Sequence, residues 1–328
     1  LPVINPFRSE LFMRTKLYLF LIVLFILSAC SPAVTPVVSN TEVDETVSET
    51  ELVDEVEPIN NAAATETEQP ITPTPSPRPT LAPDAWMEMP VVPVISDTAR
   101  DIYQRGLEMG NNPNAFSKIG DCQNINSYFL AVFEKPKEFK LGEDYAYLQE
   151  TIDYFDGSFS RESLSVQNGY NVAAVLSPLR ADKSVCEPTE SPIACELRLN
   201  QPSFVFISLE TWWANKPAEE YERYMRQIVE YAIEQGVVPI LATKADNLEG
   251  DNGVNRVIAK AAYEYDIPLW NYWRATQALP HDGLADDGFH LTFARNYFDD
   301  PVRMESAWPW RNLTALQSLD AVWRGVTE

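Results

Sequence analysis

Two short segments, far apart in the sequence, carry residue types that can do chemistry together. The first is Gly120-Asp121-Cys122, a turn that follows the short apolar run Ala115-Phe116. The second is Asp287-Gly288-Phe289-His290, which contains one of the two histidines of the chain. A thiol attacks a carbonyl poorly until a base takes its proton, and an aspartate can fix the tautomer of that base. The two segments predict a catalytic set of Cys122, His290 and Asp287.

The remaining histidine and the cysteines do not provide the ligand spacing of a zinc site, so we expect neither a metal nor another cofactor. His281 lies in the turn Pro280-His281-Asp282-Gly283, where we expect it to be exposed. Taken alone, His290 is better explained as a surface or core histidine that is hydrogen-bonded for structural reasons. Its neighbour Asp287 and the distant Gly-Asp-Cys turn favour the catalytic interpretation.

A Gly-Asp-nucleophile turn early in a domain and an Asp-x-x-His near its end resemble the SGNH/GDSL hydrolases. Members of that family carry serine where this chain has Cys122. The resemblance implies a three-layer α/β/α fold with a parallel sheet, of flavodoxin-like architecture. It also implies an esterase or acyl-ester hydrolase in which Cys122 attacks, His290 serves as base and then acid, and Asp287 orients it. A thiolate beside an imidazolium is a strong nucleophile, with a pKa well below about 8.5.

The resemblance also implies an oxyanion hole, and here the chain departs from the family pattern. Gly169 is the glycine of the second block, and its N–H would act together with that of Cys122. The third block keeps Thr211 but has Trp212 where the family has asparagine. Asn171 and Asn215 are the candidate replacements, and Trp212 either donates through its indole N–H or only packs. Loss of one such donor costs about 2.7–4 kcal/mol of transition-state stabilisation, so catalysis is weakened but not forbidden.

We assign Asp121, Thr211, Trp212 and Lys244 to substrate binding. Lys244 follows an apolar run, and it either holds an anionic substrate at the rim of the pocket or pairs with Asp246. A function from a different class also stays open, because the departures at Cys122 and Trp212 are compatible with a catalytically inactive lipoprotein. Such a protein would keep the fold and the pocket to bind a glycan or another ligand at the cell surface.

The alternation of apolar runs with amphipathic stretches independently predicts an α/β domain over residues 92–328. The predicted strands are Ser203–Leu209, Val237–Thr243 and Pro268–Trp270, and the predicted helices are Pro217–Gln235, Asn255–Tyr265 and a closing helix from Leu313 to Trp323. In such sheets the site lies at the carboxyl ends of the strands. The loops that begin at Cys122, Thr211 and Thr243 should therefore converge.

The first 30 residues predict a signal peptide with its start at Met13. Arg14 and Lys16 precede an apolar core, Leu17–Leu27, which is too short to span a bilayer. The following Leu-Ser-Ala-Cys resembles a bacterial lipobox, which implies that Cys30 carries a lipid. The alternatives are an uncleaved anchor or a chance cysteine after an apolar run. Residues 31–91 are acidic and then rich in Pro and Thr, which indicates a disordered tether. We therefore expect an extracytoplasmic protein, anchored by lipid to the bacterial cell membrane.

The formal net charge of −23 and the lack of a basic stripe argue against a nucleic-acid partner. The substrate that we expect is an ester, a glycan or a lipid, and we expect a monomer. Cys186 and Cys195 flank a turn-rich loop and predict a disulfide in an oxidising compartment. That pairing leaves Cys122 free, although other pairings are compatible with the sequence.

Overall fold

A computed structural model of the chain describes residues 80–211 and 217–328. The predicted signal peptide, Cys30 and the tether as far as residue 79 lie outside the described residues, and so do Trp212 and Asn215. The predictions that concern them stay predictions. None of the helices in the described part of the chain is long and apolar enough to cross a membrane.

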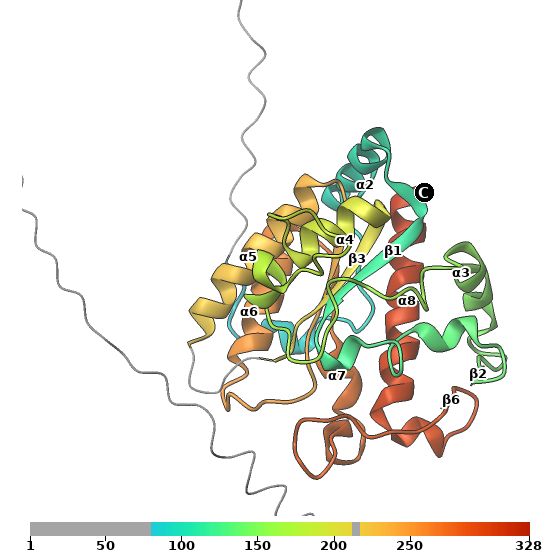
Figure 1. Cartoon of the computed structure of the whole chain (residues 1–328). Coiled ribbons are helices and arrows are strands. Elements are labelled where there is room, and N and C mark those ends of the chain that lie inside the picture. Colours follow the sequence, from blue (N-terminus) through green and yellow to red (C-terminus); the bar gives the residue numbers. More distant parts are fainter. Residues whose placement is uncertain (1–79, 212–216) are drawn as a thin grey trace, which may run out of the picture. The chain divides into compact units, whose positions relative to one another are not determined.

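The core of the fold is a parallel sheet of four strands in the order β1-β3-β4-β5 (Figure 1). The strands are β1 (Asn112–Gly120), β3 (Pro202–Ser208), β4 (Val238–Ala242) and β5 (Leu269–Trp270). Because all four strands are parallel, their carboxyl ends meet at one edge, where Gly120 is paired with Ser208. Every residue of β3 is buried, as expected for a parallel strand covered on both faces. A separate two-stranded ladder joins β2 (Phe139–Lys140) to β6 (Asn296–Tyr297).

Helices cover both faces of the four-stranded sheet (Figure 1). They are α2 (Asp97–Met109), α3 (Gln149–Tyr154), α4 (Pro192–Asn200), α5 (Ala218–Glu234), α6 (Gly253–Tyr265), α7 (Tyr272–Thr276) and α8 (Ala307–Thr327). Helices α2, α3 and α8 lie on the face where Tyr103 stacks on Phe204 and Phe155 contacts Trp323. Helices α4, α5 and α6 lie on the opposite face, to which Ser117 of β1 points. The predicted three-layer α/β/α fold with a parallel sheet is confirmed.

Helices α5 and α6 match the predicted helices closely, and α8 extends beyond the predicted Leu313–Trp323 at both ends. The short helices α3 and α7 were not predicted, and neither were α2 and α4. Both begin at ordinary capping residues: Ser96 accepts a hydrogen bond from the Ala99 N–H, and Ser191 accepts one from Ala194. Gly110, at φ 94°, ends α2 in the left-handed conformation that glycine adopts without strain. The capping signals were therefore present in the sequence.

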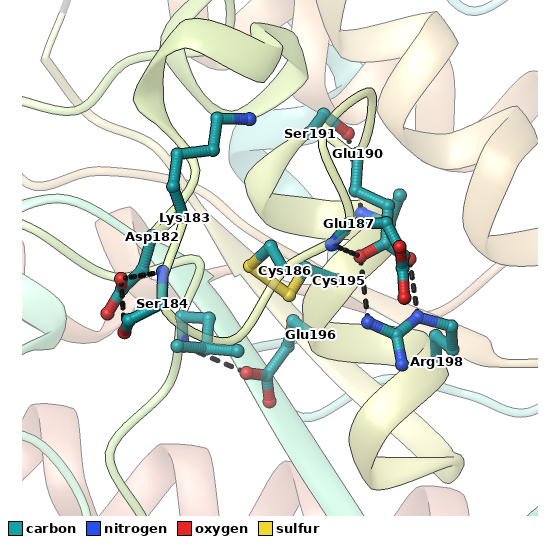
Figure 2. The surroundings of a disulfide bond; sticks show 12 residues. Asp182, Lys183, Ser184, Cys186, Glu187, Glu190, Ser191, Cys195, Glu196 and Arg198 are labelled. Atoms are coloured by element: carbon teal, nitrogen blue, oxygen red, sulfur yellow. Dashed lines mark hydrogen bonds and ion pairs between the residues drawn. A yellow bond between two sulfur atoms is a disulfide. The ribbon is translucent and has the colours of Figure 1, made fainter.

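The predicted disulfide between Cys186 and Cys195 is confirmed, with the two Cα atoms 5.4 Å apart (Figure 2). Glu190 lies next to the two sulfur atoms, but its carboxylate accepts hydrogen bonds from Arg198. The sulfur atoms are bonded to each other and are not thiolates, so this cluster does not form a metal site. Cys122 is a free, half-buried cysteine.

The domain begins before the predicted boundary at residue 92. A 3-10 helix at Ala85–Glu88 buries Trp86 completely, and its ring lies edge-on to Trp273 with 4.8 Å between the centroids. The side-chain amide of Asn271 donates to the carbonyl of Trp86 at 2.8 Å. The acidic and Pro-rich composition before residue 92 predicted a tether, and the buried Trp86 was therefore not recognised as part of the domain.

We expect Trp86→Ala to lower the free energy of unfolding by about 3–5 kcal/mol, the usual cost of deleting a large buried aromatic side chain. Urea unfolding followed by circular dichroism measures the change. Val94→Ala is the matched control, because Val94 is 83% exposed and its truncation should change little. Equal stability of the two variants would show that the segment before residue 92 is not part of the cooperative domain.

Candidate active site

The turn that carries Cys122 is fixed by the carboxylate of Asp121. Cys122 begins the 3-10 helix Cys122–Asn124 directly after β1. The buried Asp121 carboxylate accepts hydrogen bonds from the N–H of Gln123 at 3.0 Å and from the N–H groups of Glu210 and Thr211 at 2.8 Å. It also accepts the Thr211 hydroxyl at 3.0 Å. Asp121 and Thr211 therefore join the loops after β1 and β3. Asp121 is fully buried, so its role is structural, whereas the half-buried Thr211 stays a predicted substrate contact.

A buried ion pair lies behind this turn and connects it to α8. The Arg311 guanidinium is 2.5 Å from the Glu210 carboxylate and donates to the Ser208 hydroxyl at 2.8 Å. Both charged side chains are almost fully buried. Arg311 also lies over the rings of Phe129 and Trp270, at 5.1 and 5.4 Å from their centroids. Burial raises the pKa of Glu210 to about 7, and Arg311 opposes that rise.

The predicted base and its orienting carboxylate are in hydrogen-bond contact. The Nδ1 atom of His290 lies 2.6 Å from Oδ2 of Asp287, and Oδ1 of Asp287 accepts the N–H groups of Phe289 and His290. These hydrogen bonds, the one to the His290 ring foremost, lower the pKa of Asp287 to about 2. An ionised carboxylate can only accept, so Nδ1 carries a proton, and in the neutral imidazole the lone pair is then on Nε2. This is the tautomer that a general base needs.

Cys122 and His290 line the same cleft, although they are far apart in the sequence. The cleft has a volume of about 710 Å³. Its lining residues are Cys122, Gln123, Ile125, Tyr128, Asn168, His290, Leu291, Phe293 and Trp308. Among the hydrogen bonds of the described residues, none joins Cys122 to His290. Catalytic hydrogen bonds are often long in a free enzyme and tighten when substrate binds, so the shared cleft is compatible with a nucleophile and its base.

The ionisation of Cys122 is the opposite of what we expected. Burial raises the pKa of its thiol to about 11, and the charges of Asp121 and Glu210 add to the rise. The prediction of a thiolate with a lowered pKa is therefore wrong for this structure. At neutral pH the sulfur is a protonated thiol, so any attack by this sulfur would need a base to take its proton.

Gly169 and Asn171, the two described residues that we expected in the oxyanion hole, have different environments in the structure. The segment around residue 166 runs beside the end of β1, where Val166 forms a bridge with Gly120 and the Gly120 N–H donates to the Ser165 carbonyl. Gly169 follows in a left-handed conformation, at φ 78°. Asn171 is buried, and its side-chain oxygen accepts the N–H groups of Ala173 and Ala174. Asn171 therefore caps a turn and does not line the cleft.

Two residues that sequence reasoning did not assign to the site do line the cleft. Asn168 is exposed on its wall, one residue before the predicted Gly169. Gln123 is only 3% exposed, and neither end of its side-chain amide has a hydrogen-bond partner in the structure. An unpaired buried amide is costly, so a substrate that supplies partners for Gln123 gains by doing so. Its position directly after the nucleophile was the only signal in the sequence.

Lys244 lies away from the cleft, so its predicted contact with substrate is replaced by the pairing alternative. Its side chain is 3% exposed, and its ammonium group is 2.6 Å from both Asp246 and Glu249. The backbone N–H of Lys244 donates to Asn255 in α6. The loop after β4 is thus anchored to α6, whereas the loops after β1 and β3 are bonded to each other.

Comparisons with known proteins give a weak structural match and no match to a protein family. No protein-family model matches the sequence, and none of the curated proteins matches it. Among the solved structures that match is the crystal structure of TesA, with 17% sequence identity and a TM-score of 0.37. The match covers 62% of this chain and 99% of TesA. At that identity and score, we base no argument on the likeness.

Replacing Lys244 by Met should lower the free energy of unfolding by about 3–5 kcal/mol, because Asp246 and Glu249 would keep buried charges without a cation. Lys260→Met is the matched control: Lys260 is 41% exposed on the side chain and pairs with Glu222, so the expected loss is under about 1 kcal/mol. Urea unfolding of both variants provides the comparison. Similar losses would contradict the structural role given to Lys244.

The raised pKa of Cys122 predicts slow alkylation at moderate pH. A thiol with a pKa of about 11 contains far less thiolate at pH 8 than the same thiol in the unfolded chain, so iodoacetamide should modify the folded protein roughly a hundredfold more slowly. Mass spectrometry of the peptide that contains Cys122 measures the rate from about pH 7 to about pH 10. Folded and urea-unfolded samples with the same pH dependence would show that the environment does not raise the pKa.

Proposed function

We propose that the chain is an SGNH-type hydrolase that cleaves an ester bond, with Cys122 as nucleophile and the His290–Asp287 pair as base. The observation that carries the proposal is one cleft that is lined both by a free cysteine and by a carboxylate-oriented histidine. Cys122 directly follows β1, and His290 lies three residues after the carboxylate that contacts its ring. A cleft with an apolar wall and a few polar groups is typical of a small-molecule site.

In this mechanism the thiol proton is transferred to His290 while the bond between Sγ of Cys122 and the ester carbonyl forms. The Sγ atom of Cys122 attacks the ester carbonyl while Nε2 of His290 takes the thiol proton, because the raised pKa keeps the sulfur protonated until that moment. The tetrahedral intermediate collapses, and the leaving alkoxide receives the proton from His290. Water then attacks the thioester with His290 again as base, which releases the acid and restores the thiol. Asp287 stabilises the imidazolium in both steps.

The N–H of Cys122 and that of Gly169 are the backbone donors that the resemblance assigns to the oxyanion. The exposed amide of Asn168 on the cleft wall is a further candidate donor, and the Gln123 amide lies buried and unpaired behind the lining. The presence of Asn168 supports catalysis in a chain whose third block lacks the family asparagine. A donor placed on the developing oxyanion contributes about 2.7–4 kcal/mol.

We also propose that the enzyme acts outside the cytoplasm, tethered to the bacterial cell membrane through a lipid on Cys30. The Cys186–Cys195 disulfide supports this location, since disulfides persist in oxidising compartments. The lipobox-like sequence before Cys30 supports the anchor. A tether of about sixty residues would let the domain reach substrates in the envelope or outside it.

The purified full chain should hydrolyse para-nitrophenyl esters of short acids. Cys122→Ala should abolish the activity, and His290→Ala or Asp287→Asn should reduce kcat/KM by about 10²–10⁴-fold, the usual contribution of a general base and its support. His281→Ala is the matched control, because it removes the other histidine, which lies in an exposed turn. Unchanged activity in His290→Ala would show that the base is wrongly assigned.

Cys122→Ser distinguishes the enzyme from the inactive binding protein. If the wild type is inactive and only Cys122→Ser hydrolyses esters, the fold and the base are intact and the natural chain is a binding lipoprotein. If neither form hydrolyses any ester, while the wild type binds a glycan in a calorimetric titration, the hydrolase proposal is refuted in favour of the alternative.

A further inference from the structure

A second cavity opens beside the Cys122 cleft and is lined by basic side chains; we call it the basic pocket. It has a volume of about 360 Å³. Tyr128, Phe293 and Trp308 belong to the walls of both cavities, so the two share an aromatic boundary. The Tyr128 and Trp308 rings are stacked, with their centroids 5.2 Å apart. The basic residues Lys135, Lys137 and Arg295 line the part of the basic pocket that the cleft does not include.

The positive charge of the basic pocket is only partly neutralised. Glu138 is the one carboxylate among its lining residues, and it lies 3.6 Å from Lys135. Within residues 80–211 and 217–328, no ion pair is formed by Lys137 or Arg295. Behind the wall, the buried ammonium of Lys118 donates to the side-chain oxygen of Asn126, which also lines the pocket. Uncompensated cations in a chain of net charge −23 mark a place that attracts an anion.

The wall of the basic pocket is fixed from behind by Asn312 of α8. The fully buried Asn312 accepts the Leu130 N–H at 2.7 Å and donates to the Tyr128 carbonyl at 2.9 Å. It also donates to the side-chain oxygen of Asn296 at 3.0 Å, on the opposite flank of the pocket. Leu130 has a φ of 63°, a strained conformation for leucine that these hydrogen bonds help to maintain. A pocket fixed in this way loses little entropy when a ligand binds.

We propose that the basic pocket binds an oxyanion, a carboxylate or a phosphate, at the end of the substrate remote from the ester. The inference rests on the proposed hydrolase function, because it extends the same cleft. Carbons next to the scissile bond would lie against Tyr128, Phe293 and Trp308, and the terminal oxyanion would lie between Lys137 and Arg295. Arginine is suited to planar oxyanions, and a lysine adds a point charge. The substrate class is therefore an acidic ester with an apolar stretch between the ester and the acid.

Paired substrates test the proposal. On the acyl side, the para-nitrophenyl monoesters of glutarate, adipate and suberate are compared with neutral esters of equal carbon number. On the leaving-group side, para-carboxyphenyl valerate is compared with phenyl valerate. We expect kcat/KM to be about three- to tenfold higher for the charged member of at least one pair at low ionic strength, and the preference to shrink in high salt.

The double variant Lys137→Gln/Arg295→Gln should bring the ratio of charged to neutral kcat/KM close to one. Lys183→Gln/Arg223→Gln is the matched control, because it removes one lysine and one arginine at exposed positions elsewhere. The control should keep the wild-type ratio. A ratio close to one in the wild type for every pair, or a ratio that both double variants lower equally, would overturn the proposal.

A binding measurement separates this proposal from the proposed function. The para-nitroanilides of the same acids are amide analogues that resist hydrolysis, and calorimetry of the full chain measures their affinity. Tighter binding of the acidic anilide, lost in Lys137→Gln/Arg295→Gln, supports the basic pocket even if no ester is turned over. Ester hydrolysis together with equal binding of acidic and neutral anilides keeps the hydrolase and refutes the oxyanion site.

Discussion

The carboxylate of Asp121 is the constraint on which the site depends. Four donors converge on it, one from the Cys122 turn and three from the loop after β3. Parallel pairing aligns the ends of β1 and β3, but it does not set the conformation of the loops that follow. Asp121 sets it, and Glu210 carries the constraint onward to Arg311 in α8. Helix α8 also contributes Trp308 to the lining of both cavities, and its Asn312 holds the backbone of Tyr128 behind the basic pocket, so the same helix supports the Cys122 turn and both cavities.

The sequence was informative where one physical requirement determines a residue type. Uninterrupted apolar runs identified β3 and β4, because a strand covered on both faces has no polar side to show. The helical spacing of Tyr221, Met225 and Ile228 identified α5 for a similar reason. The Asp287–His290 contact was also predictable, since a separation of three residues within one turn suffices to bring the side chains together.

The sequence was misleading where the answer depends on which of several partners a polar side chain meets. Lys244 pairs with Asp246 and Glu249, and the sequence alone did not decide between this pairing and a position at the pocket rim. Asn171 caps a turn, although it follows the second-block glycine. Asp121 looked like part of a binding motif and is instead a buried acceptor. Long-range packing decides these choices, and short motifs contain no information about it.

The thiol of Cys122 shows a conflict between geometry and reactivity. Asp121 and Glu210 fix the turn and connect it to α8, yet their negative charges, together with burial, raise the pKa of the sulfur to about 11. A serine hydroxyl in the same turn would be neutral in any case, so the two carboxylates would not change its ionisation in the ground state. Cysteine therefore gains no pre-formed thiolate here and depends on His290 as a serine would. The surroundings of Cys122 thus favour a neutral side chain, and the proposed hydrolase would have to rely on general-base catalysis.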